Sequence, residues 1–289
     1  MGSFRRFRGG HEELHAYSQR KTDPTSPPNH YYLTDKSLGG ISFGKAKIDI
    51  CLRRQLTKWG TRSAEPGAEK QHCGLLVIQL TSAQDPKFKL KYLTGDIDFS
   101  SGVELGDIKP GGMSGYPYEK RVTKGIEFSP QIEAPGTTVA VGSINKSSES
   151  TKTYQWLFTA KKLTNPSDKD KIYNRLSWTL EDQKEGSSSI FDRPITLYVE
   201  LYFTTNVPQA FKVTVNVDGK LKSRRAEFKR KWFCFAPAEP CVGQMVEPKF
   251  TNPPRPVDHL TATIIAQVRQ ANKDAIPEIV DVQQAAPSS

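Results

Sequence analysis

The sequence predicts an all-β protein, an antiparallel β-sandwich, and three observations favour this fold class. Many short segments alternate apolar and polar residues with a period of two, which is typical of half-buried strands. Glycine, proline, asparagine and aspartate separate these segments, as in turns between strands. Convincing helical stripes of apolar residues at i, i+3, i+4 and i+7 are missing. Short strands with such punctuation are the signature of a sandwich or a barrel, and we expect the sandwich.

The clearest strand is predicted over 194–203 (PITLYVELYF), where apolar residues occupy every second position and face one core. In 211–221 (FKVTVNVDGKL) the same alternation leads to Asp218-Gly219, a dipeptide that favours a tight hairpin turn. The segment 74–80 (GLLVIQL) is apolar on both faces, so we expect it at the centre of a sheet. Further strands are expected over 45–52, 87–93, 125–132, 137–143, 153–160 and 175–182. The late segment 259–269 alternates too and could be a strand or a short helix, and we favour a strand.

We expect the chain to divide into an arm, one domain and a tail. Residues 1–30 form a flexible arm, because they are polar and end in a proline-rich stretch that keeps the chain extended. Residues 31–269 form a single β-sandwich domain, in which 60–72 and 104–124 are expected as long loops. Residues 270–289 form a flexible tail.

Length and composition are those of a globular protein that folds without covalent cross-links. The chain has 289 residues, of which 36% are hydrophobic, and its 14 Phe, 10 Tyr and 4 Trp are large enough to fill a core. Trp156 and Trp178 are expected in that core. The N-terminus has no apolar segment of the secretory kind, and no apolar run is long enough to span a membrane. We therefore expect a cytoplasmic protein.

The cysteines and acidic residues give weak signals for metal binding. Four cysteines have no C-x-x-C spacing, so we expect buried free thiols and no metal. These cysteines are Cys51, Cys73, Cys234 and Cys241. A metal site with His72 and His259, and a disulfide between the last two cysteines, stay open. Asp96 and Asp98 form a D-x-D pair that calcium could use with further oxygen donors, but turn carboxylates are the favoured interpretation. The donor candidates are Asp107, Glu181 and Asp182. No cofactor is expected.

Catalytic motifs are missing from the sequence. It contains no G-x-S-x-G, no H-E-x-x-H and no phosphate-binding G-x-x-x-x-G-K-[ST] pattern. The glycine clusters in 38–44 and 110–115 precede strands and not helices, so they are expected to form turns. We therefore expect a protein that is not an enzyme, while a catalytic site assembled from loops stays open.

The most unusual feature is the segment 220–231 (KLKSRRAEFKRK), which carries seven basic residues and one acid. It supplies +6 of the net charge of +10. Its cations are Lys220, Lys222, Arg224, Arg225, Lys229, Arg230 and Lys231. If this segment is a strand, two interpretations stand side by side. Lysines commonly protect an exposed sheet edge, whereas a row of cations also attracts an anionic partner.

Two resemblances bear on function. The stretches LGGISFG (38–44), YQWLF (154–158) and RLSWTLED (175–182) together resemble uncharacterised fungal proteins with β-rich cytosolic domains, over about residues 30–235. That resemblance implies no activity. A basic strand on a sandwich also looks like the polybasic face of lipid-binding C2 domains, so the sandwich is expected to be C2-like or jelly-roll-like.

The function that we expect is non-enzymatic binding of an anionic partner through the basic segment. A lipid surface or another macromolecule would be that partner. The alternative is a nucleic-acid-associated structural protein such as a coat protein, with the arginines of the arm facing nucleic acid. A protein partner and the oligomeric state stay open.

Overall fold

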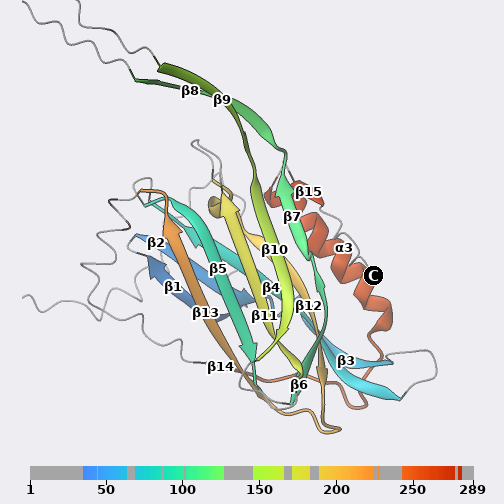
Figure 1. The fold of residues 1–289 in the computed structure, drawn as a ribbon. Coiled ribbons are helices and arrows are strands. Elements are labelled where there is room, and N and C mark those ends of the chain that lie inside the picture. The colour runs from blue at the N-terminus through green and yellow to red at the C-terminus, as the bar shows by residue number, and fades with distance from the viewer. Residues whose placement is uncertain are drawn as a thin grey trace, which may run out of the picture.

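Two antiparallel sheets face each other and make up most of the chain that the structure describes (Figure 1). The computed structural model describes residues 35–43, 45–63, 69–85, 88–100, 102–126, 146–165, 171–182, 189–223, 225, 227, 243–276 and 279–281. The prediction of an all-β, antiparallel, sandwich-like fold is confirmed.

The first sheet has the strand order β1-β2-β4-β12-β6, with β3 pairing with β4 outside this path. Its strands are β1 (Lys36–Phe43), β2 (Ala46–Leu52), β3 (Lys58–Ser63), β4 (Lys70–Ala83), β6 (Val103–Lys109) and β12 (Ile195–Phe203). The predicted segment 74–80 lies within β4, in the middle of this sheet, which confirms the interpretation of its doubly apolar pattern. A short 3-10 helix, η1 (Ile190–Asp192), precedes β12.

The second sheet has the strand order β14-β13-β5-β11-β10-β7-β15. Its strands are β5 (Leu90–Phe99), β7 (Gly112–Gly115), β10 (Trp156–Thr164), β11 (Tyr173–Asp182), β13 (Phe211–Leu221), β14 (Gln244–Val246) and β15 (Ile279–Asp281). Two further strands, β8 (Tyr118–Ile126) and β9 (Lys146–Tyr154), pair only with each other among the described strands. Figure 1 shows this hairpin continuing β7 and β10 away from the two sheets.

The main core lies between the two sheets and is filled by every second residue of the strands. In β11, for example, Leu176, Trp178 and Leu180 are buried, and the residues between them are half-buried on the outer face. Trp156 and Trp178 are each 2% exposed, so the prediction that both are core residues is confirmed. Burying one large apolar side chain contributes about 1.5–3 kcal/mol, and the core holds many of them.

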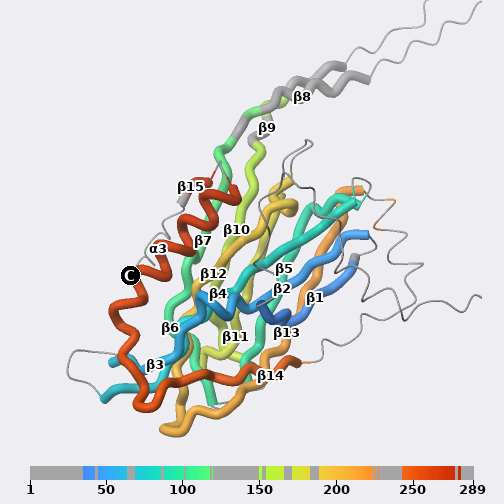
Figure 2. The backbone as a smooth tube through the Cα atoms, turned by 180° about the vertical axis from the view of Figure 1, so that it is seen from behind, coloured from blue at the N-terminus to red at the C-terminus, as the bar shows by residue number. Residues whose placement is uncertain are grey.

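A second, smaller core lies on the outer face of the first sheet, beneath helix α3 (Asp258–Ala275). Figure 2 shows this helix lying along the sheet, near β12 and β3. Ile264, Val268 and Asn272 are its buried residues, and their spacing of four places them on one face of the helix. Strand β12 is therefore buried on both faces, with Tyr198 on the side of the helix.

The prediction of a strand over 259–269 is wrong, because this segment lies within α3. Its residues alternate, but they also place apolar side chains four positions apart, and the two patterns cannot be separated over eleven residues. The outer face of β4 and β12 is apolar. Both strands already have neighbouring strands on each side, so a further strand could not pair with them, and a helix covers this face instead. The expected boundary of a flexible tail at 270 consequently falls inside the helix, and β15 pairs with β7 beyond it.

The hairpin turn predicted at Asp218-Gly219 is also wrong. Both residues lie within β13, where they pair with Thr94 and Leu93 of β5. The alternation that begins at the start of β13 continues to a buried Leu221, so the pairing along β5 outweighs the local turn preference.

The segments predicted as long loops contain regular strands. Residues 60–72 include the end of β3 and the start of β4, and 104–124 include β6, β7 and part of β8. Residues 1–30, 137–143 and most of 125–132 lie outside the described residues.

Candidate functional site

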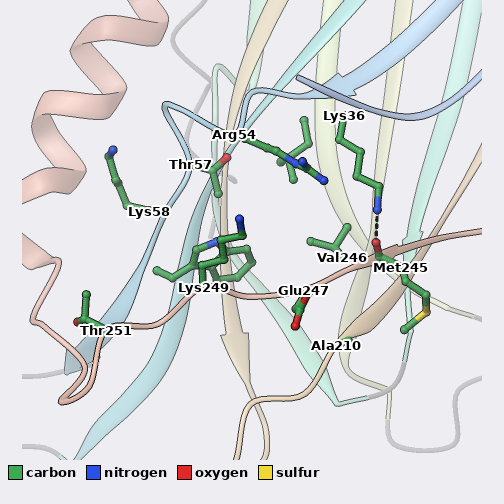
Figure 3. A pocket seen from close by; sticks show the side chains of 12 residues that line it. Lys36, Arg54, Thr57, Lys58, Ala210, Met245, Val246, Glu247, Lys249 and Thr251 are labelled. Atoms are coloured by element: carbon green, nitrogen blue, oxygen red, sulfur yellow. Dashed lines mark hydrogen bonds between the residues drawn. The ribbon is translucent and has the colours of Figure 1, made fainter. Parts of the chain in front are cut away.

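A cavity of about 750 Å³ opens where the edge of the first sheet meets the edge of the second. One wall is formed by Lys36 of β1 and by the turn between β2 and β3, which carries Arg54. The other wall is formed by β14 and the segment that follows it, up to Thr251. Figure 3 shows these side chains around a shared space. We call this cavity the basic groove.

Four cationic side chains line the basic groove, against one carboxylate. They are Lys36, Arg54, Lys58 and Lys249, and the carboxylate is that of Glu247. Four positive charges and one negative charge leave a formal charge of +3 on the lining. Such a concentration of one sign in a concave site raises the local concentration of counter-ions.

The cations differ in how they are held. The Lys36 ammonium group donates a hydrogen bond to the backbone oxygen of Met245, which joins β1 to β14 (Figure 3). Lys58 Nζ donates to Gln55 O over 2.9 Å. Within the part of the chain that the structure describes, neither Arg54 nor Lys249 forms an ion pair, and both are exposed. Figure 3 shows Arg54 and Lys36 reaching into the same space, while Lys58 lies at the far end.

The turn that carries Arg54 is fixed to the first sheet by hydrogen bonds. Arg53 N donates to Val77 O over 2.8 Å, and Val77 N donates to the Thr57 hydroxyl over 3.2 Å. Within the turn, Thr57 N donates to Arg53 O over 3.0 Å. The Arg53 side chain binds outside the groove, to Asp35 over 2.8 Å. Arg54 therefore projects from a rigid turn, which is how binding side chains are usually held.

The base of the basic groove is apolar. Trp59 lines it and packs against three phenylalanines, at ring-centroid distances of 6.2 Å, 6.1 Å and 6.0 Å. These are Phe203, Phe211 and Phe250. Leu52 and Val246 are buried beside it, and the exposed Met245 lines the rim. The groove thus combines cationic side chains with a fixed aromatic surface.

The structure describes only part of the predicted basic segment, namely residues 220–223, 225 and 227. The strand ends at Leu221, and Glu227 N donates to Ser223 O over 2.9 Å, as in a helical turn. Among the described residues of this segment, the strand interpretation therefore holds only for Lys220 and Leu221, and Arg225 and Glu227 lie in a helical turn. The Glu227 carboxylate accepts from Leu221 N over 3.1 Å, which closes this turn on the end of β13.

Individual residues of that segment have different surroundings. Lys220 is exposed on the outer face of the second sheet, and Arg225 is exposed in the helical turn. Lys222 Nζ lies 3.3 Å from the buried carboxylate of Asp182, so its charge is compensated. Four predicted binding residues lie outside the described residues: Arg224, Lys229, Arg230 and Lys231.

Sequence reasoning missed the basic groove, because its cations come from separate segments. The pairing of β1 with β2 and of β13 with β14 places these cations at the edges of the two sheets, and the packing of the sheets brings the edges together. Each looks like an ordinary surface cation in the sequence, and no spacing or motif distinguishes them.

The two described cysteines are free thiols, Cys73 buried and Cys51 half-buried, and neither is activated. Burial raises the pKa of Cys51 to about 11, with the negative charges of Asp49 and Asp35 adding to the effect. Burial also raises the pKa of Cys73 to about 12, followed by the charge of Glu200. Both thiols stay protonated at neutral pH, whereas a nucleophile or metal ligand must be a thiolate. Cys234 and Cys241 lie outside the described residues.

Two of the acidic residues considered for calcium, Asp98 and Asp182, have other partners. Asp98 accepts from Arg175 over 2.6 Å and from Asn216 over 3.3 Å. Asp182 accepts from the Ser189 hydroxyl over 2.7 Å. In the described ranges, no three or more His, Cys, Asp and Glu side chains gather as a metal site requires. His72 instead packs edge-on against Phe250, at 5.1 Å between ring centroids.

Comparisons with known proteins give little. No known protein family matches the chain, and no curated protein matches it either. Among solved structures, the chain is similar to the NetB toxin of Clostridium perfringens in its membrane-inserted form, with a TM-score of 0.26 and 7% identity. The match covers 63% of this chain and 82% of the toxin chain. A likeness this low carries no argument about function. None of the described helices has the length and apolar character needed to cross a membrane.

Proposed function

We propose that this protein is a non-enzymatic binding module that holds an anionic group in the basic groove. The observation that carries the proposal is the lining of the 750 Å³ cavity by four cations and one carboxylate. Mutual repulsion of these cations is unfavourable, and a bound anion would relieve it. Charge-assisted hydrogen bonds from Lys and Arg are also about twice as strong as neutral ones.

The groove supports this role better than the basic segment does. Lys222 already has the Asp182 carboxylate as partner, and Lys220 projects from a broad sheet face away from any described cavity. Lys220 and Arg225 would add long-range attraction and so speed the encounter with an anion. The contact itself is assigned to the groove.

Two further observations support the proposal. One favours binding over catalysis, and the other favours a cytoplasmic setting. The described thiols have raised pKa values, so they lack the thiolate that cysteine catalysis needs. Free cysteines are typical of proteins kept in a reducing compartment.

The test compares two triple variants with the same loss of charge. The first, Lys36→Gln/Arg54→Gln/Lys249→Gln, removes the cations that lie around the centre of the groove. The second, Lys91→Gln/Lys161→Gln/Lys220→Gln, removes exposed lysines of the second sheet outside it. Calorimetric titration with inositol hexakisphosphate, over a series of salt concentrations, measures the affinity of each protein. Circular dichroism and urea midpoints verify that both variants fold.

We expect the groove variant to lose affinity by at least about tenfold, which is 1.4 kcal/mol. The control variant should stay within about twofold, because its charges lie outside the contact. Equal losses of affinity in both variants would show that anion binding depends only on the net charge of the protein, and the proposed site would be wrong.

A further inference from the structure

We propose that the ligand of the basic groove is a small organic phosphate, with a phosphate group on the cations and an aromatic ring on Trp59. This inference rests on the proposed function and adds the chemical class of the ligand. It starts from the fact that the groove presents two different surfaces to one cavity, one cationic and one apolar.

The size of the cavity favours an organic molecule over a bare ion. Its volume of about 750 Å³ lies within the range of roughly 300–1,000 Å³ that is usual for sites of drug-sized ligands. An inorganic phosphate bound by the cations would leave the half-buried Trp59 and the exposed Met245 in contact with water. A ligand with an apolar body would cover these side chains and displace that water.

The charge of the lining favours a phosphate over a carboxylate. A phosphomonoester carries about −1.5 to −2 at neutral pH and offers three strong acceptor oxygens, whereas a carboxylate carries one charge. Arg54 can donate two parallel hydrogen bonds to such a group. Lys36, already held by Met245 O, reaches into the same space, as Figure 3 shows. One bound phosphate group would neutralise several of these cations without a large rearrangement of their side chains.

The aromatic part of the proposal comes from the fixed position of Trp59. Its ring is held by Phe203, Phe211 and Phe250, so little conformational freedom is lost when a ligand packs on it. Gly74 allows this position, because any Cβ there would collide with the indole ring. A rigid, half-buried indole beside cations suits a planar ring that carries a phosphate.

The test uses four probes with the wild-type protein. Phenyl phosphate carries both the ring and the phosphate, inorganic phosphate carries only the charge, and phenol carries only the ring. Calorimetry measures the affinity of each, and vesicles containing phosphatidic acid serve as a fourth probe for phosphate at a lipid surface. We expect phenyl phosphate to bind at least about tenfold more tightly than inorganic phosphate, because its ring covers Trp59.

Two variants separate the contributions of charge and ring. Lys36→Gln/Arg54→Gln should weaken binding of both phosphates. Trp59→Leu should weaken phenyl phosphate alone, and Met245→Ser repeats that test at an exposed rim residue whose substitution leaves the core intact. Tyr173→Leu, a half-exposed aromatic on β11, is the matched control and should change neither affinity.

The outcomes distinguish the two proposals. If inorganic phosphate and phenyl phosphate bind equally well, the groove binds anions but the ligand class is wrong. If phenyl phosphate fails to bind while the vesicles bind, the proposed ligand class is wrong, and the ligand is instead phosphate at a lipid surface. If none of these probes and no inositol hexakisphosphate binds, the proposed function fails as well.

Discussion

The side-chain amide of Asn272 forms two hydrogen bonds with the backbone of Thr196, where a neighbouring strand would otherwise be needed. Thr196 N donates to Asn272 Oδ1 over 2.8 Å, and Asn272 Nδ2 donates to Thr196 O over 2.9 Å. In the described part of the first sheet, β6 pairs with β12 only from Tyr198 onward. Asn272 and Thr196 are 2% and 3% exposed, so α3 is fastened where two buried backbone groups would otherwise be unpaired.

Replacing Asn272 should therefore destabilise the protein strongly. Asn272→Leu keeps the volume of the side chain but leaves the Thr196 N–H and C=O without partners. Each unpaired buried group costs about 1–3 kcal/mol, so we expect the two together to lower the free energy of unfolding by about 2–6 kcal/mol. Urea denaturation followed by circular dichroism measures this difference. Lys273→Ala, exposed in the same helix, is the control and should change stability by less than about 0.5 kcal/mol. A fully stable Asn272→Leu protein would refute the role of this pair.

The ion pair between the half-buried Arg62 and the buried Glu200 should show strong coupling. Glu200 is 4% exposed, and its carboxylate accepts from the Arg62 guanidinium and from Asp107 N, the latter over 3.2 Å. Arg62→Met leaves a buried charge uncompensated, which costs about 3–5 kcal/mol. In Arg62→Met/Glu200→Met that charge is gone, so most of the stability should return.

A more exposed ion pair provides the control. Lys45→Met removes the 68% exposed partner of Asp85, 3.9 Å away, and should cost at most about 1 kcal/mol. The prediction fails if the double variant is no more stable than Arg62→Met, as measured by chemical denaturation of all four proteins.

Alkaline pH should weaken the fold before exposed lysines lose their charge. Burial raises the pKa of Cys51 to about 11 and that of Cys73 to about 12, from an ordinary 9.0, and it also raises the pKa of Tyr198 and Tyr202. The folded protein therefore binds more protons than the unfolded chain once the pH passes 9. Stability is fully present below pH 9 and is lost as the pH rises toward 11 and 12.

Unfolding free energies measured from pH 7 to pH 11, with a reducing agent present, test this trend. Cys73→Ala removes the most strongly shifted thiol, so its stability should decline less steeply over the same range. A stability that stays constant or rises up to pH 11 would contradict the assignment of these pKa shifts.

The smallest residue of β5 makes room for the largest residue of β11. Gly95 pairs with Trp178 across the two strands, and a Cβ on Gly95 would lie 2.5 Å from Trp178 Cζ2. Gly95→Ala should therefore displace the indole and destabilise the fold by about 1–3 kcal/mol. Near-ultraviolet circular dichroism reports the displacement, and thermal unfolding reports the stability. Ser177→Ala, next to Trp178 on the outer face, should leave both measurements unchanged.

Sequence reasoning predicted the fold class well, because strand alternation follows directly from burial of one face. It placed β12 and β4 correctly, and it placed Trp156 and Trp178 in the core. It failed at α3, where eleven residues satisfy both a strand and a helix pattern. The outer face of the first sheet decides between them, and that face exists only in the folded chain.

The candidate site was far less predictable than the fold. Local charge density in the sequence pointed to 220–231, but Lys222 is paired with a buried aspartate that lies forty positions away in the chain. The four cations of the basic groove are individually unremarkable, and they become neighbours only where the edges of the two sheets meet. Turn propensity failed for the same reason at Asp218-Gly219, where pairing with β5 keeps the strand straight.

The most direct measurement follows individual lysines while an anion binds. Reductive methylation with ¹³C-formaldehyde keeps the charge of each lysine and gives it an NMR signal, which Lys→Arg variants assign. During titration with inositol hexakisphosphate, the signals of Lys36 and Lys249 should shift together and saturate at one concentration, while those of Lys161 and Lys220 stay in place. Uniform shifts of all lysine signals, or shifts confined to Lys220 and its neighbours, would contradict the assignment of the anion to the basic groove.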